Sequence, residues 1–191
     1  GGRSGHDEFL WGNLRWHKCT RHGLCAVIKC KPVRIRHRAP GNTNPYPFYL
    51  LNSNKESVVI NLKTTEGREL LLRLVEHSDV LVENFNSGVM ERLGLGWDVL
   101  HERNPDLVCA SGRGFRSDES IPAMDLTIQA ASGAMWSTGF PDGLPVKAGP
   151  AICDFLGGAH LFAGVLAALF ARERGAGGQQ VLAFGRLDRL L

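Results

Sequence analysis

Residues 57–82 read SVVINLKTTEGRELLLRLVEHSDVLV. The β-branched run at 57–62 predicts a strand, because polar residues bound it on both sides. A helix is expected to open at Thr64, and its apolar stripe comprises Leu70, Leu71, Leu74 and Val75. Residues 79–82 then predict a second, short buried strand. Strand, helix and strand in so short a stretch form a βαβ unit, which implies parallel pairing and a right-handed crossover.

The alternation of helices and strands continues toward the C-terminus. The pattern predicts short helices over 89–93 and 97–102, a strand over 107–111, a helix over 125–137, and a long helix over 159–172 that ends at the glycine-rich run 175–178. Strands alternating with helices are typical of the α/β class. We therefore expect a Rossmann-like parallel sheet with flanking helices.

Composition and cysteine usage point to a globular protein of the cytoplasm. The chain of 191 residues is 43% hydrophobic and 21% charged, as in ordinary globular domains. The apolar run 161–170 is too short to span a membrane, and the N-terminus shows no signal-peptide pattern. The five cysteines are odd in number and irregularly spaced, which favours reduced thiols in the cytosol over disulfides. We expect no membrane association.

The N-terminal segment, residues 1–45, is predicted to be irregular and basic. Residues 1–40 contain nine of the 22 Lys and Arg residues but two of the 19 acidic ones. The basic run 33–38 could bind nucleic acid, but a solvated arm is the favoured interpretation. His17, Cys19, His22 and Cys25 lack the paired spacing of a zinc site, so no metal is expected.

Asp154 is the most informative single residue. It lies in the small, apolar stretch GPAICDFLGG, residues 149–158. A carboxylate in such surroundings is costly unless it is solvated, paired or used. Asp154 could be a plain N-cap of the following helix, or it could be a reactive group that the helix N-terminus stabilises.

Several short motifs, taken in order, resemble family III CoA-transferases, the group of formyl-CoA transferase, carnitine and bile-acid CoA-transferases and α-methylacyl-CoA racemase. The matching stretches are 52–57 (NSNKES), 61–67 (NLKTTEG), 79–85 (DVLVENF), 88–94 (GVMERLG), 104–105 (NP), 129–133 (QAASG) and Asp154 with its helix. The resemblance covers residues 46–191 and implies the N-terminal portion of the large domain. The first strand and the second domain of the family have no counterpart in this sequence, so we expect a fold that is incomplete relative to the full family fold and a truncated member.

The resemblance implies a reaction. In the family, the residue matching Asp154 is the nucleophile, and CoA moves from an acyl-CoA to a carboxylic acid through a covalent aspartyl intermediate. Backbone amides at the helix N-terminus are expected to stabilise the oxyanion. The partners implied are an acyl-CoA, a carboxylic acid acceptor and, for the full-length family, a second subunit in a homodimer. CoA is a substrate here, and no cofactor is expected.

The resemblance also assigns CoA contacts. Asn84, Phe85 and Arg92 match CoA-contacting positions, Lys63 matches a lysine near the nucleotide phosphates, and Ile60 and Leu93 match apolar positions that line the nucleotide. An amide can bond pantetheine or adenine, an aromatic ring can stack, and a guanidinium can bind phosphate oxygens. The alternatives for these residues are a turn asparagine, a core phenylalanine and solvated basic side chains.

Two further positions bear on the choice between transferase and racemase. Racemases of the family carry a histidine where this chain has Met124, and a thioether cannot move a proton at neutral pH. His160 is expected on the exposed helix face and not as a catalytic base. Transferase is favoured; a non-catalytic CoA-binding remnant and a racemase-type relative remain the alternatives.

Overall fold

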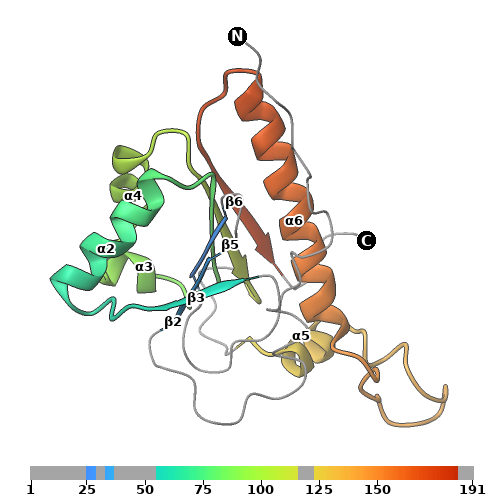
Figure 1. Cartoon of the computed structure of the whole chain (residues 1–191). Coiled ribbons are helices and arrows are strands. Elements are labelled where there is room, and N and C mark those ends of the chain that lie inside the picture. The colour runs from blue at the N-terminus through green and yellow to red at the C-terminus, as the bar shows by residue number, and fades with distance from the viewer. Residues whose placement is uncertain (1–24, 29–32, 37–54, 116–122, 185–191) are drawn as a thin grey trace.

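The computed structural model describes residues 25–28, 33–36, 55–115 and 123–184 (Figure 1). The strands are β1 (Cys25–Ile28), β2 (Val33–Arg36), β3 (Glu56–Val59), β4 (Val80–Glu83), β5 (Val108–Arg113) and β6 (Gln179–Phe184). The helices are α2 (Thr65–Glu76), α3 (Val89–Arg92), α4 (Trp97–Arg103), α5 (Asp125–Ala131) and α6 (Ile152–Glu173).

The strands form one six-stranded sheet in the order β3-β2-β1-β4-β5-β6. β2 pairs with β3, β4 with β5, and β5 with β6 in parallel, whereas β1 runs antiparallel to both of its neighbours, β2 and β4. All strands of this sheet except β1 therefore point in one direction. The predicted α/β class with a parallel sheet and flanking helices is confirmed, and the antiparallel β1 is the departure from it.

The predicted βαβ unit is present with a wider crossover than expected. β3, α2 and β4 follow one another, and β3 and β4 point the same way, but β2 and β1 lie between them in the sheet. These two inserted strands lie in the segment 1–45, which the sequence predicts to be irregular. Pairing with β3 and β4 provides backbone partners that a local sequence pattern cannot reveal. The solvated arm expected at 33–38 is thus a strand over 33–36, and residues 37 and 38 lie outside the described residues.

The middle of the sheet is covered by helices on both faces. Figure 1 shows α2, α3 and α4 on one face and α6 on the other. Side chains alternate accordingly along β4, where Leu81 packs in the cluster under α2 and α4 while Val80 and Val82 pack against α6. Burial of both faces explains why β4 reads as a continuous apolar run.

α6 is the long helix that closes the second face. Its Leu161, Val165 and Ala168 are buried against β4, β5 and β6. A Cβ added at Gly164 would come within 2.6 Å of a Val181 methyl, so this glycine allows the close approach of α6 to β6. Within the described residues, α6 is long and apolar enough to cross a membrane. The apolar run that we judged too short belongs to this longer helix, whose inner side packs on the sheet.

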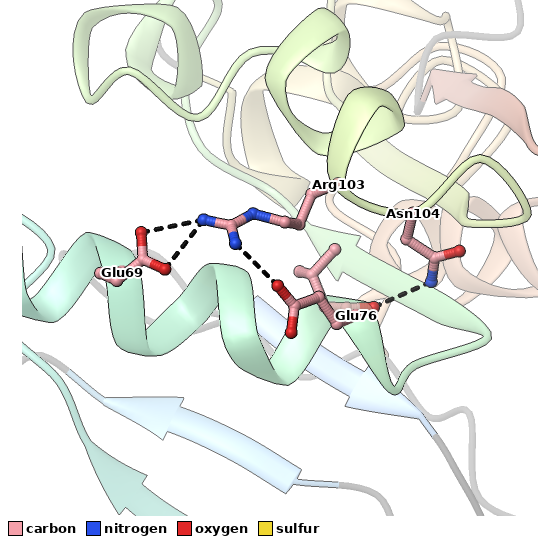
Figure 2. Close-up of polar contacts among 5 residues, drawn as sticks. Glu69, Glu76, Arg103 and Asn104 are labelled. Atoms are coloured by element: carbon pink, nitrogen blue, oxygen red, sulfur yellow. Dashed lines mark hydrogen bonds and ion pairs between the residues drawn. The ribbon is translucent and has the colours of Figure 1, made fainter.

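A polar clamp joins α2 to α4 on the opposite face (Figure 2). The Asn104 amide, directly after α4, donates 2.8 Å hydrogen bonds to the carbonyls of Val75 and Ser78 at the end of α2. Arg103 reaches Glu76 at 2.7 Å and Glu69 at 2.8 Å. The Asn104 bonds are part-buried, while the ion pairs are exposed, so Asn104 is the stronger tie.

Replacing Asn104 with alanine should lower the free energy of unfolding by about 1–3 kcal/mol, because two carbonyls at the end of α2 lose their donor. Arg103→Ala should have a smaller effect, since its partners remain solvated. Urea unfolding followed by circular dichroism measures both changes. An equal or larger loss for Arg103→Ala would contradict this ranking.

Candidate functional site

The candidate site lies along the carboxyl ends of the parallel strands. Lys63 follows β3, Asn84 and Phe85 follow β4, and Phe115 follows β5. Figure 1 shows α5 and the first turn of α6 at the end toward which β5 and β6 point. In open α/β sheets, ligands bind in crevices outside these carboxyl ends. The sequence-predicted residues therefore gather at the edge where a ligand is expected.

The apolar residues predicted to line the nucleotide belong to the core under α2, α3 and α4. Ile60 is 3% exposed, and Phe85 and Leu93 are partly buried against the same cluster. Ile60 is therefore a core residue, while Phe85 and Leu93 each keep a portion of their surface at the edge. Phe85 is thus in part a core phenylalanine, which was the alternative to a CoA contact.

The polar residues predicted to contact CoA lie in two turns, one after β4 and one before α2. Asn84, Arg92 and Lys63 are all exposed. Gly88, which precedes α3, has a φ of 75°, and a Cβ added there would lie 3.0 Å from Arg92 Nη1. The Arg92 guanidinium thus lies over the turn that follows β4. Lys63 lies in the turn before α2, where its backbone amide is bound by Asn61.

A buried ion pair supports this turn, and the sequence analysis did not identify it. Glu83, at the end of β4, is 1% exposed. Its Oε1 lies 2.7 Å from Arg113 Nη2 at the end of β5, and its Oε2 accepts a 2.7 Å bond from the Phe85 amide. Glu83 thereby fixes the backbone between Asn84 and Phe85. The sequence signal that could have indicated this ion pair is the charged residue Glu83 at the end of an otherwise apolar strand.

Asp154 lies in the first turn of α6, which differs from the expected placement. The helix begins at Ile152, not at residue 159, and its N-cap is Ala151. Asp154 is the third helical residue and is half-buried, so the alternative of a plain N-cap does not apply. The glycines at 157 and 158 suggested a later start because glycine disfavours helices. Gly158 is buried within α6 instead.

The cap of α6 comes from Asp125, the first residue of α5. The Asp125 carboxylate is 4% exposed, and its Oδ1 accepts hydrogen bonds from the amides of Cys153 at 3.0 Å and Asp154 at 3.4 Å. Gln129, fully buried, donates from Nε2 to Asp125 Oδ2 at 2.7 Å. Two orphan amides of the helix are thus satisfied from another helix. Gln129 lies in a motif that the sequence analysis singled out, but the bond of Asp125 to α6, across 28 residues, required the fold.

The expected use of the α6 amides for an oxyanion needs correction. The Ile152 amide donates to the Pro150 carbonyl at 2.9 Å, and the Phe155 amide donates to Ala151 at 3.1 Å. With Cys153 and Asp154 bonded to Asp125, the first four amides of α6 all have partners. These amides therefore stabilise the start of the helix and are not open to an oxyanion. What the first turn offers to a ligand is the Asp154 carboxylate.

Cys153 is the other potential nucleophile beside Asp154. Its side chain is 5% exposed, and burial raises the pKa of the Cys153 thiol, as do the nearby carboxylates of Asp125 and Asp154. A thiol that stays protonated is a poor nucleophile. The local electrostatics therefore favour the carboxylate over the sulfur. Cys153 and the buried Cys109 are both free, as expected of reduced thiols.

The remaining predicted positions have simpler surroundings. His160 is exposed on α6 with Nδ1 2.8 Å from the Leu156 carbonyl, which agrees with a helix-face residue. Met124 precedes α5 and is 48% exposed. Among the described residues, no group of three or more His, Cys, Asp or Glu is placed to bind a metal. His17, Cys19 and His22 lie outside them.

The candidate site has two halves, the predicted CoA contacts and Asp154, and these lie on different faces of the sheet. Phe85 and Leu93 pack in the cluster under α2, α3 and α4, whereas Asp154 follows Cys153, which packs with Phe115 and Ile128. β5 lies between them, and it carries Arg113 toward Glu83 and leads into Phe115. A ligand that contacts both halves must therefore extend along the carboxyl edge, as a long molecule such as an acyl-CoA does.

These features define an α/β protein with a carboxylate in the first turn of a helix at the carboxyl edge of its sheet. Residues 27–184 match CoA-transferase family III. The chain is 44% identical over 138 residues to an acetyl-CoA:oxalate CoA-transferase of Acetobacter aceti, covering 70% of this chain and 36% of that protein. It is 43% identical over 136 residues to a formyl-CoA:oxalate CoA-transferase of Streptomyces coelicolor, covering 70% and 33%.

Solved structures give the same assignment. A CAIB/BAIF family protein from Brucella suis aligns with a TM-score of 0.64 at 36% identity, covering 67% of this chain and 35% of that one. A hypothetical protein from Mycobacterium tuberculosis aligns at 0.65 and 35% identity, covering 69% and 38%. The chain belongs to CoA-transferase family III. It spans about a third of the length of the curated relatives it matches.

Proposed function

We propose that this chain takes part in CoA transfer between an acyl-CoA and a carboxylic acid, with Asp154 as the nucleophile. The observation that carries the proposal is the position of Asp154, half-buried in the first turn of a 22-residue helix at the carboxyl edge of the sheet. The positive end of the helix dipole favours negative charge there. The relatives named as CoA:oxalate transferases support the reaction class.

The proposed chemistry divides the exchange into acyl transfers. The Asp154 carboxylate attacks the thioester carbonyl, the C–S bond breaks, and an aspartyl–acyl anhydride and CoA thiolate form. The thiolate attacks the aspartyl carbonyl, which releases the donor carboxylate and leaves an aspartyl–CoA thioester. An acceptor carboxylate then displaces the thiolate, and the thiolate takes the acceptor acyl group from the second anhydride. Each step forms one activated acyl group as it consumes another, and the last step frees the Asp154 carboxylate and leaves CoA on the acceptor.

The CoA moiety is proposed to lie along the turn after β4. Arg92 and Lys63 are exposed cations at that edge, and Asn84 offers an amide beside the partly exposed Phe85 ring. Phosphate oxygens suit the guanidinium fork of Arg92. Ile60 contributes as a support beneath Phe85, because its own side chain is buried.

Racemisation is a weaker proposal for this chain. It needs two groups that exchange protons with opposite faces of an α-carbon. Met124 occupies the position before Asp125 and cannot titrate at neutral pH. A CoA-binding chain without covalent chemistry is the other alternative, and the experiments below separate it from a transferase.

The setting of the reaction is also a proposal. We place the protein in the cytoplasm, in line with the packing of α6 on the sheet. A second copy is the proposed protein partner, because large apolar side chains are exposed around α5 and α6, among them Trp136 at 79%, Phe140 at 87% and Leu144 at 85%. CoA enters as substrate, and the proposed steps use no metal.

Incubation of the chain with an acyl-CoA should modify Asp154 covalently, because the carboxylate becomes an anhydride or a thioester. Hydroxylamine converts either species into an aspartyl hydroxamate that peptide mass spectrometry locates. Asp154→Asn should show no modification, and Asp154→Glu tests the geometry. Labelling at Cys153, or undiminished labelling in Asp154→Asn, would contradict the assignment.

Arg92→Ala should weaken CoA binding about tenfold or more, the size expected for one charge-assisted hydrogen bond to phosphate. Isothermal titration calorimetry with CoA measures the change, and Asn84→Ala should weaken binding as well. Arg73→Ala is the matched control, because Arg73 is an exposed arginine in the last turn of α2. Equal affinity in Arg92→Ala and the wild type would remove Arg92 from the site.

A further inference from the structure

Gln129 is the most completely bonded polar side chain near the candidate nucleophile. Its side chain is 0% exposed. Nε2 donates to Asp125 Oδ2 at 2.7 Å and lies 3.4 Å from the Pro150 carbonyl, while Oε1 accepts a 2.9 Å bond from the Ala148 amide. The Gln129 amide therefore joins α5 to the loop that leads into α6.

These contacts determine the orientation of the Asp125 carboxylate. Gln129 holds Oδ2, and this leaves Oδ1 directed at the amides of Cys153 and Asp154. A buried carboxylate without its donor would either rotate or admit water, since an unsatisfied buried acceptor is costly. The start of α6 thus depends on Gln129 through its hydrogen bond to Asp125.

The loop before α6 is fixed by the same group. The Ala148 amide bonds to Gln129, and the Val146 amide bonds to the Met135 carbonyl at 3.0 Å. Lys147 Nζ lies 3.1 Å from the carbonyls of Ala148 and Gly149. Hydrogen bonds therefore hold the backbone of residues 146–150 in place directly before the first turn of α6.

We infer that Gln129 is a positioning residue for Asp154: it acts through Asp125 and the 148–150 backbone to hold the first turn of α6 in the geometry in which the Asp154 carboxylate can attack. This inference rests on the proposed role of Asp154. Gln129 is not proposed as a reacting group, because its side chain is fully buried and its amide is bonded to Asp125 and Ala148.

Gln129→Met, which keeps the length of the side chain but removes its hydrogen bonds, tests the inference. Hydrogen exchange followed by NMR should show that the amides of Cys153 and Asp154 lose about tenfold or more of their protection. The rate of Asp154 labelling by acyl-CoA should fall by a similar factor, whereas the CoA dissociation constant should stay unchanged, since Arg92 and Phe85 lie on the other face.

Asn104→Ala is the matched control, because Asn104 is likewise an amide side chain with two bonds to backbone carbonyls, but directly after α4. It should lower thermal stability without changing the exchange of the two α6 amides relative to global unfolding. If Asn104→Ala slows labelling as much as Gln129→Met, the effect is general destabilisation and the inference is wrong.

Gln129→Glu provides a rescue that a merely structural role would not show. A protonated glutamic acid can donate to Asp125 and accept from Ala148, whereas its anion would face the Asp125 carboxylate. The charged or titratable groups around position 129 are Asp125 on α5, Cys153 and Asp154 on α6, and Lys147 in the loop. The labelling rate of Gln129→Glu relative to wild type should therefore rise as the pH falls from 7.5 to 5.5.

The outcomes separate this inference from the proposed function. If the wild type shows no label on Asp154 but Gln129→Met still exposes the two α6 amides, the nucleophile assignment fails and the positioning of the helix start holds. If the wild type is labelled and Gln129→Met is labelled equally fast with unchanged amide protection, the inference about Gln129 is overturned. A Gln129→Met chain that does not fold leaves Gln129→Glu to decide: a relative rate independent of pH would contradict the inference.

Discussion

The buried carboxylate of Asp125 is the constraint on which the site depends. It is 4% exposed, and such a group is tolerated only when its oxygens are bonded. Gln129 bonds one oxygen, and the amides of Cys153 and Asp154 bond the other. Satisfying this one group therefore brings together α5, the loop before α6 and the first turn of α6. Any sequence that keeps Asp125 buried must keep these elements in contact.

The consequence for chemistry is a division of labour between two carboxylates. Asp125 takes the helix amides and is shielded, so it is a structural acceptor. Asp154, in the first turn of α6, remains half-buried at the same helix end. Because burial and neighbouring carboxylates raise the pKa of the Cys153 thiol, the residue between Ile152 and Asp154 is a weak competitor. This arrangement favours acyl transfer to an oxygen nucleophile.

β5 lies between the proposed nucleophile and the proposed CoA side. Arg113 at its end pairs with the buried Glu83, and Glu83 also binds the Phe85 amide. Phe115, directly beyond β5, packs with Ile128 and Cys153. The turn after β4 and the start of α6 therefore both contact residues at or just beyond the end of β5. An extended substrate along the carboxyl edge would contact both ends of this connection.

Local pattern predicted most of the fold. The helix capped by Thr64, the short helices around Gly94 and Gly96, and the buried strands near residues 80 and 108 carry their signals within a few residues of each other. β6 was not predicted, although half-buried and exposed residues alternate along it. β2 was not predicted as a sheet strand either, since its parallel partner β3 lies about 20 residues farther along the chain.

The candidate site was predictable as a set of residues but not as a geometry. Sequence resemblance selected Asp154, Arg92 and Phe85. It could not show that Asp125 caps α6, because the bond joins residues 28 apart, nor that Ile60 is buried. Glu83 was missed for the same reason: its partner Arg113 is 30 residues away and becomes adjacent only when β4 and β5 pair.

A crystal structure of the chain soaked with an acyl-CoA tests the central claim most directly. The account predicts continuous electron density from an Asp154 carboxyl oxygen or carbonyl carbon to the acyl group or to the CoA sulfur, with Asp125 still bonded to the amides of Cys153 and Asp154. Density joining the acyl group to Cys153, or an acyl-CoA bound away from the start of α6, would contradict it.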